Sequence, residues 1–90
     1  MDAVVLKVSS KSNPNLVAGA LAGTIKEAGR AELQAIGAGA INQAVKAVAI
    51  TRNMFAQSDS KVDLICIPSF ADLTIDDQIR TSIKLVVEPR

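Results

Sequence analysis

Two short polar segments carry residue types that bind phosphate. Residues 9–13 hold three serines, one lysine and one asparagine, and residues 37–39 are a Gly-Ala-Gly turn. Neither segment contains an acidic residue. Each precedes a stretch of helical character, and the free N–H groups and partial positive charge of a helix N-terminus favour anions. The two segments therefore predict an anion site if the fold brings them together.

The predicted site combines these two segments with the helix that follows the second. Lys11 supplies a full positive charge, and the glycines flanking Ala38 let the backbone approach an anion closely. Taken singly, each segment also has a structural explanation, as a capped surface loop or as a tight strand-to-helix turn. The prediction of an anion site therefore depends on the two segments lying side by side in the fold. The predicted phosphate-binding residues are Ser10, Lys11, Ser12, Gly37, Ala38, Gly39, Asn42 and Lys46.

An enzymatic function is not expected, because the residues that most catalytic sites use are missing. The chain has no histidine and one cysteine, Cys66, which lies in an apolar run typical of a buried strand. The Gly-Ala-Gly turn has neither the spacing of a Walker A loop nor that of a dinucleotide fingerprint. We expect no catalytic residue, no metal site and no cofactor.

Composition predicts a single domain over residues 1–90. Hydrophobic residues make up 49% of the chain, with two Phe and no Trp or Tyr, so the core should be aliphatic. No apolar run approaches the roughly 18 residues of a membrane span, and we expect a cytoplasmic protein with no membrane partner. The net charge is only +1, but residues 1–56 carry six basic and three acidic side chains. An anionic partner should therefore meet this half.

The hydrophobic pattern predicts the element order β-α-β-α-β-β. We expect strands at 3–8, 31–36, 62–67 and 81–87, and helices at 14–28 and about 40–55. Pro68 should end the third strand, and residues 70–80 should form an acidic connection. Two crossover helices imply that the first three strands run parallel with both helices on one face. The fold class is α/β, an α+β two-layer sandwich with a mixed four-stranded sheet.

The second predicted helix is apolar on two sides. At about 100° per residue, one face should lie on the sheet and holds Ile41, Ala44, Val45, Val48 and Phe55. The roughly opposite face holds Ala47, Ile50 and Met54, which we interpret as the interface of a homodimer or higher homo-oligomer. The alternative is that these are scattered apolar surface residues with no partner.

Four segments carry a family resemblance that spans nearly the whole chain. They are KVSSKSNPNLVAGALAG at 7–23, QAIGAGAINQAVKAVAI at 34–50, and residues 62–68 and 83–90. Together they resemble bacterial stage V sporulation protein S. The resemblance implies a role in spore development, although family members also occur in bacteria that do not form spores.

More distantly, residues 37–55 resemble the second helix of the archaeal Alba chromatin proteins. This likeness implies the strand order 1-2-4-3, a dimer, and nucleic-acid binding by a basic first loop and a basic hairpin. Lys11 lies in the matching first loop. Ala38 stands where Alba proteins commonly carry a basic residue, and the hairpin here carries Asp72, Asp76 and Asp77.

Three functions follow, in order of preference. The first is a nucleic-acid-binding regulatory protein that makes weak, backbone-directed contacts with DNA or RNA. The second is a self-assembling scaffold with protein partners. The third is a sensor of a nucleotide or small anion.

Overall fold

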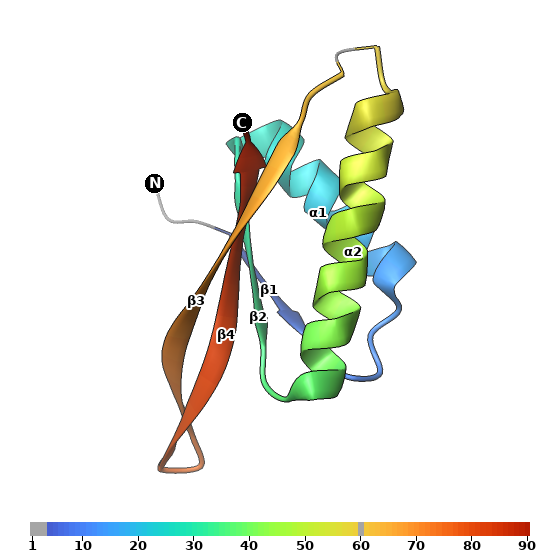
Figure 1. Ribbon diagram of the computed structural model, residues 1–90. Helices are drawn as coiled ribbons and strands as arrows, with labels where there is room; N and C mark the ends of the chain where they lie inside the picture. Colours follow the sequence, from blue (N-terminus) through green and yellow to red (C-terminus); the bar gives the residue numbers. More distant parts are fainter. Residues whose placement is uncertain (1–3, 60) are drawn as a thin grey trace.

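Both helices lie on one face of a four-stranded sheet (Figure 1). The computed structural model describes residues 4–59 and 61–90. The elements are β1 (Val5–Val8), α1 (Pro14–Ala28), β2 (Ala31–Ala35), α2 (Ala38–Gln57), β3 (Leu64–Ile75) and β4 (Gln78–Pro89). The strand order is β1-β2-β4-β3, with β1 parallel to β2 and the other pairs antiparallel. The predicted element order, mixed sheet and strand order are confirmed; the predicted strand start at Ala3 lies outside the described residues.

Helix α1 has the termini that its sequence predicts. The side chain of Asn13 accepts a hydrogen bond from the N–H of Asn15 at 2.8 Å, and Pro14 occupies the first turn, where a missing N–H costs nothing. At the other end Gly29 adopts a φ of 86°, a left-handed conformation in which its N–H bonds to the carbonyl of Ile25. These local signals fix where the helix begins and ends.

The two helices pack closely on each other through small residues. Ala18 and Ala22 of α1 and Ala44 and Ala47 of α2 are buried, and Thr51 donates a hydrogen bond to the carbonyl of Ala47 at 2.8 Å. The same hydroxyl lies 3.3 Å from the carbonyl of Ala18. Alanine at these positions lets the helix backbones approach one another. Helix α2 therefore packs against two neighbours, the sheet and α1.

This second contact corrects the predicted faces of α2. Ala47, expected on an outer dimer interface, is 0% exposed because it faces α1, whereas Val45, expected on the sheet, is 53% exposed. The prediction considered only a helix on a sheet and omitted the neighbouring helix. Ile50 is half-buried and Met54 is exposed, so these two predicted interface residues remain at the surface.

The third and fourth strands are much longer than predicted. Each has 12 residues, and they pair from Leu64↔Pro89 to Ile75↔Gln78. Pairing of β4 with β2 stops at Ile83↔Ala35, so residues 71–82 form a two-stranded hairpin, here called the arm, that extends past the rest of the molecule, the body. The expected acidic connection at 70–80 is wrong. Pro68 does not end β3, because β3 is an edge strand, where proline is tolerated.

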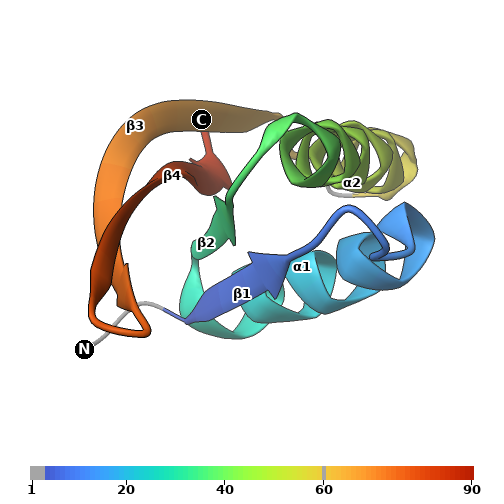
Figure 2. The same cartoon turned by 90° about the horizontal axis from the view of Figure 1, so that it is seen from below.

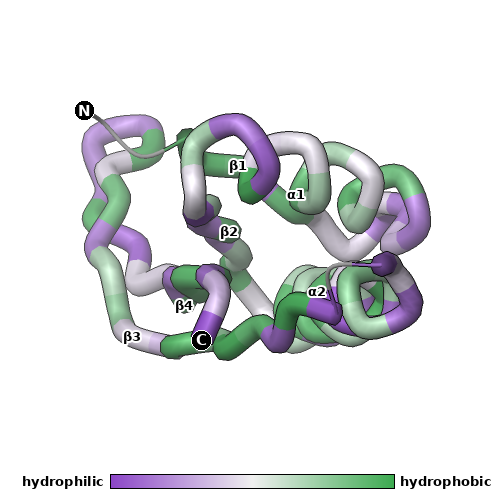
Figure 3. The backbone as a smooth tube through the Cα atoms, turned by 90° about the horizontal axis from the view of Figure 1, so that it is seen from above, coloured by the Kyte–Doolittle hydropathy of each residue, from purple (hydrophilic) through white to green (hydrophobic). Residues whose placement is uncertain are grey.

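The arm is curved and exposed. Seen along the sheet in Figure 2, it bends away from the helix layer and curls back towards the β1 side. Figure 3 shows hydrophilic and hydrophobic residues following one another around it. Among the described residues of the arm only Ser82 is buried, and its hydroxyl donates to the carbonyl of Ala71 at 2.9 Å. The molecule measures 47 × 28 × 17 Å.

Within the described part of the chain, neither helix is long and apolar enough to cross a bilayer.

Candidate phosphate-binding site

The two polar segments singled out by the sequence lie in contact. Since β1 and β2 are parallel neighbours, their carboxyl ends deliver the following residues to the same edge of the sheet. A Cβ on Gly39 would lie 2.9 Å from the Cβ of Ser10, so the start of α2 packs closely against the side chain of Ser10. The side-chain amide of Gln43 donates to the carbonyl of Ser12 at 2.9 Å and ties the 9–13 loop to α2. The predicted convergence is confirmed.

The 9–13 loop is a folded turn held by its own serines. The N–H of Ser9 donates to the hydroxyl of Ser12 at 2.9 Å, and the N–H of Lys11 donates to the hydroxyl of Ser9 at 3.2 Å. The N–H of Ser12 also bonds to the carbonyl of Ser9 at 3.1 Å. The hydroxyl of Ser12, a predicted anion ligand, thus helps to shape the loop. The Lys11 side chain projects from this bend and is exposed.

The two helix N-termini differ in what they offer an anion. In α1, Pro14 has no N–H and the N–H of Asn15 already bonds to Asn13, so few donors remain. In α2, the N-cap is Gly37, which has no side chain to satisfy the first N–H groups. Neither helix has an acidic residue in its first turn. The α2 terminus therefore keeps more free N–H donors than the α1 terminus.

Each glycine of the 37–39 turn has its own structural requirement. Gly37 has φ 90° and ψ 157°, a conformation that is essentially restricted to glycine. Gly39 has ordinary backbone angles, but a side chain there would press against Ser10. Together they place the uncapped start of α2 directly against the Lys11 loop. The structural explanation of the turn is confirmed, and this geometry also leaves the first N–H groups of α2 without a side-chain cap.

The remaining predicted residues extend away from this point along α2. Asn42 is exposed, with its amide 3.5 Å from the side-chain oxygen of Gln43. Lys46 is also exposed, but it lies about 12 Å along the helix axis from Ala38 at 1.5 Å per residue. A single phosphate bound at the α2 terminus would not reach Lys46, whereas a polymer with phosphates at intervals would.

Sequence reasoning missed Gln43, which joins the loop to the helix. Its position one turn into α2 was the available signal, since a long amide side chain there reaches back over the helix start. Its hydrogen bond to Ser12 crosses 31 residues of sequence, so only the fold reveals the partner.

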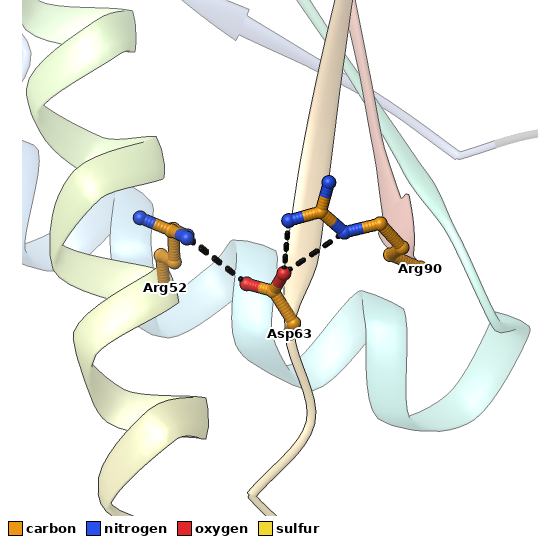
Figure 4. A network of polar contacts seen from close by, with 3 residues as sticks. All are labelled: Arg52, Asp63 and Arg90. Atoms are coloured by element: carbon orange, nitrogen blue, oxygen red, sulfur yellow. Dashed lines mark hydrogen bonds and ion pairs between the residues drawn. The ribbon is translucent and has the colours of Figure 1, made fainter.

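A second basic cluster lies at the far end of α2. Asp63 accepts a hydrogen bond from Arg52 at 3.2 Å and one from the Nε of Arg90 at 3.0 Å (Figure 4). The hydrogen bond from Arg90 is the main cause that lowers the pKa of Asp63 below its ordinary 3.8, and Arg52 adds to it. Two guanidinium groups on one carboxylate leave an excess of positive charge. The cluster joins the end of the chain to the helix layer.

Cys66 differs from its prediction. It is exposed on the edge strand rather than buried, although its partial burial still raises the pKa of the thiol above 9.0. A protonated thiol is a poor nucleophile. Within the described ranges, no three residues of the types that ligate metals are grouped to hold an ion.

The chain was compared with models of known protein families. Residues 4–90 match the family model of stage V sporulation protein S. The match includes both polar segments of the site, the two helices and the arm.

Proposed function

The chain belongs to the family of stage V sporulation protein S, a sporulation-related family that is not a known enzyme family, and from this premise we propose that it is a nucleic-acid-binding regulatory protein. It acts by holding phosphates of the polymer backbone, and it does so as a homo-oligomer. The Alba resemblance points to the same class of partner.

One observation carries the proposal: the uncapped N-terminus of α2 lies against the loop that presents Lys11. Backbone N–H groups with a partial positive charge and a full positive charge together form the usual environment of a bound phosphate. Lys46, further along the same helix, supplies a second cation at a spacing that suits a polymer. Residues 9–13 and the first turn of α2 contain no carboxylate to compete for this position.

The other charges restrict how a nucleic acid would approach. The tip of the arm carries Asp76 and Asp77, and Figure 1 shows this tip at the same end of the molecule as the start of α2. A polyanion would be repelled from the tip, so the backbone contacts fall on the loop and the helix. Contacts are therefore few, and the affinity should be weak and sensitive to salt.

The scarcity of aromatic residues favours a double-stranded nucleic acid over a single-stranded one. The chain has no Tyr or Trp, and of its two Phe only Phe70 is exposed, so there is no row of aromatic side chains on which successive single-stranded bases could stack. Contacts with phosphates alone favour a duplex, either DNA or structured RNA, and carry no sequence preference.

Fluorescence anisotropy with labelled 20-base-pair DNA and RNA duplexes at low salt tests the proposal. We expect saturable binding that Lys11→Gln weakens several-fold, because one phosphate contact is lost. Lys61→Gln is the matched control, since this exposed lysine lies beyond the C-terminal end of α2 and should leave the affinity unchanged. Absence of binding to both duplexes at high protein concentration, or equal effects of the two substitutions, would refute the proposal.

Self-assembly has its own support in exposed apolar side chains. Phe70 and Ile79 are 78% and 75% exposed and lie on the same face of the β3–β4 hairpin, while Met54 is 44% exposed on α2. A second copy of the chain would remove them from water. Sedimentation velocity at two concentrations should show a dimer or larger species. The double variant Phe70→Ser, Ile79→Ser should sediment as a monomer. A wild-type monomer at both concentrations would eliminate self-assembly.

A further inference from the structure

We propose that the concave space between the body and the arm is a binding site for a small organic anion that has an apolar part. This space, here called the arm cavity, has a volume of about 420 Å³ and lies between the carboxyl ends of β1 and β2 and the β3 side of the arm. Its size is within the usual range of small-molecule sites, about 300–1,000 Å³. It adjoins the nucleic-acid site through Ser10, which packs against Gly39, and through Ile36, which precedes Gly37.

Lys7 and Gln34 form the polar floor of the arm cavity, and the row that they begin continues across the sheet to Lys84, outside the cavity lining. Lys7 of β1 pairs with Gln34 of β2, and Gln34 pairs in turn with Lys84 of β4. Leu6 and Leu33, their neighbours in sequence, pack in the core beneath the helices, so side chains at 7 and 34 point to the opposite face. Two lysines thus stand two strand spacings apart, about 10 Å, with an amide between them.

The positive charge of this row is not paired with the carboxylate on the same face of β2. Glu32 lies on the same face of β2, but its carboxylate pairs with Arg30 at 3.8 Å. Neither Lys7 nor Lys84 takes part in any ion pair found among the described residues. Asp76 and Asp77 follow the lining residue Ile75 at the tip of the arm, so an anion in the cavity would be drawn to the opposite side, where Lys7 has no carboxylate partner.

The opposite wall is apolar and comes from the arm. Leu73 and Ile75 line the cavity, and both lie on the face of β3 that looks towards the open side of the sheet. Beyond Ile83↔Ala35 no strand pairs the arm with the body, so this wall can shift to fit an occupant. Figure 2 shows how the curl of the hairpin brings it back over the β1 side.

The lining defines the chemistry of the ligand. Lys7 selects a carboxylate, sulfonate or phosphate group, the hydroxyls of Ser9 and Ser10 offer hydrogen bonds, and Leu73 and Ile75 cover an aliphatic or aromatic body. Cavities of this kind, mostly apolar with a few convergent polar groups, are typical ligand sites. A highly charged ligand such as a nucleoside triphosphate is disfavoured, since most of it would face apolar side chains.

The probe for this site is 1-anilinonaphthalene-8-sulfonate, which joins an apolar ring system to one sulfonate. Its fluorescence on titration gives the dissociation constant, and amide chemical shifts in nitrogen-15 spectra locate it on the folded protein. We expect saturable binding of one molecule per chain, with shifts grouped at residues 7–10, 34–36 and 73–75. Dispersed amide signals throughout the titration exclude binding to a partly unfolded state.

Three variants separate the charge from the apolar wall. Lys7→Met keeps the length of the side chain and should raise the dissociation constant about tenfold, in line with the loss of one charge-assisted contact. Leu73→Ser should raise it by a similar factor, whereas Lys61→Met, remote from the cavity, should leave it unchanged. No saturable binding up to millimolar probe, shifts that fall elsewhere, or equal affinities in all variants would overturn the proposal.

Discussion

The body and the arm are made from the same two strands yet are stabilised in different ways. In the body, β3 and β4 lie under the helices, and Leu64, Leu85 and Val87 are buried. In the arm, the same strands have no layer on either face, and only Ser82 is buried among the described residues. The body owes its stability to apolar burial, whereas the arm depends on its backbone ladder and its turn.

This difference indicates how the molecule divides its tasks. The body must be rigid, because it holds the Lys11 loop against the α2 terminus within van der Waals contact. The arm contributes little to the core and can instead present exposed groups and form one wall of the arm cavity. Substitutions should therefore have large effects on global stability in the body and small ones in the arm.

The largest expected effect contrasts one core residue with one arm-side residue. Leu33 is fully buried in β2, so Leu33→Ala should lower the free energy of unfolding by about 2–5 kcal/mol. Ile79→Ala removes an arm side chain of similar size that is 75% exposed and should change the free energy of unfolding by about 0.5 kcal/mol or less. Urea denaturation followed by circular dichroism measures both. Equal losses would show that the arm belongs to the cooperative core.

The next effect tests the contact between the two segments of the candidate site. Gly39→Ala would place a methyl group 2.9 Å from the Cβ of Ser10 and force the loop and helix apart, at a cost of about 1–3 kcal/mol. Gly23→Ala is the matched control: nothing lies within 4 Å of its Cβ position in the exposed face of α1. It should stabilise by about 0.5–1 kcal/mol because alanine favours helix. A neutral Gly39→Ala would contradict the close packing.

A smaller effect concerns the pH dependence of the Asp63 cluster. The pKa of Asp63 is lowered in the folded state, so its ion pairs stabilise the protein above the ordinary carboxyl value of 3.8 and are lost as pH falls below it. Unfolding free energies of the wild type and Asp63→Asn should therefore differ near neutral pH and converge under acid. A gap that widens on acidification would contradict this sign.

The smallest effect is confined to the arm. Asp76 and Asp77 have positive φ angles of 50° and 62°, the conformation of a type I′ turn, which Asn-Gly adopts more easily than Asp-Asp. The double variant Asp76→Asn, Asp77→Gly should therefore stabilise the turn. Amide hydrogen exchange should become slower in residues 71–82 and stay unchanged in α1 and α2. Slower exchange throughout the molecule would show that arm and body unfold together.

The sequence predicted those parts of the fold that depend on local patterns. The helix cap at Asn13-Pro14, the stop at Gly29 and the alternation in β1 each follow from neighbouring residues. The burial of Ala47 was missed because it depends on α1, which is distant in sequence. The arm was missed because Pro68 suggested a strand end, and only its place on an edge strand shows why it is tolerated.

For the candidate site, sequence predicted the two segments and their convergence but not their unequal roles. Parallel pairing of β1 and β2 follows from a crossover helix, so the adjacency of residues 9–13 and 37–39 could be deduced. That Asn13 occupies the α1 donors while Gly37 leaves those of α2 uncapped required the hydrogen bonds themselves. The same holds for Gln43, whose partner lies in another element.

The central claim is that Lys11 and the α2 terminus jointly hold a nucleic-acid phosphate. The most direct measurement is the dependence of duplex affinity on salt, expressed as the slope of log affinity against log salt concentration, for the wild type and Lys11→Gln. The account predicts that the substitution reduces the magnitude of this slope by about 1, the loss of one phosphate contact. Identical slopes in the two proteins would contradict it.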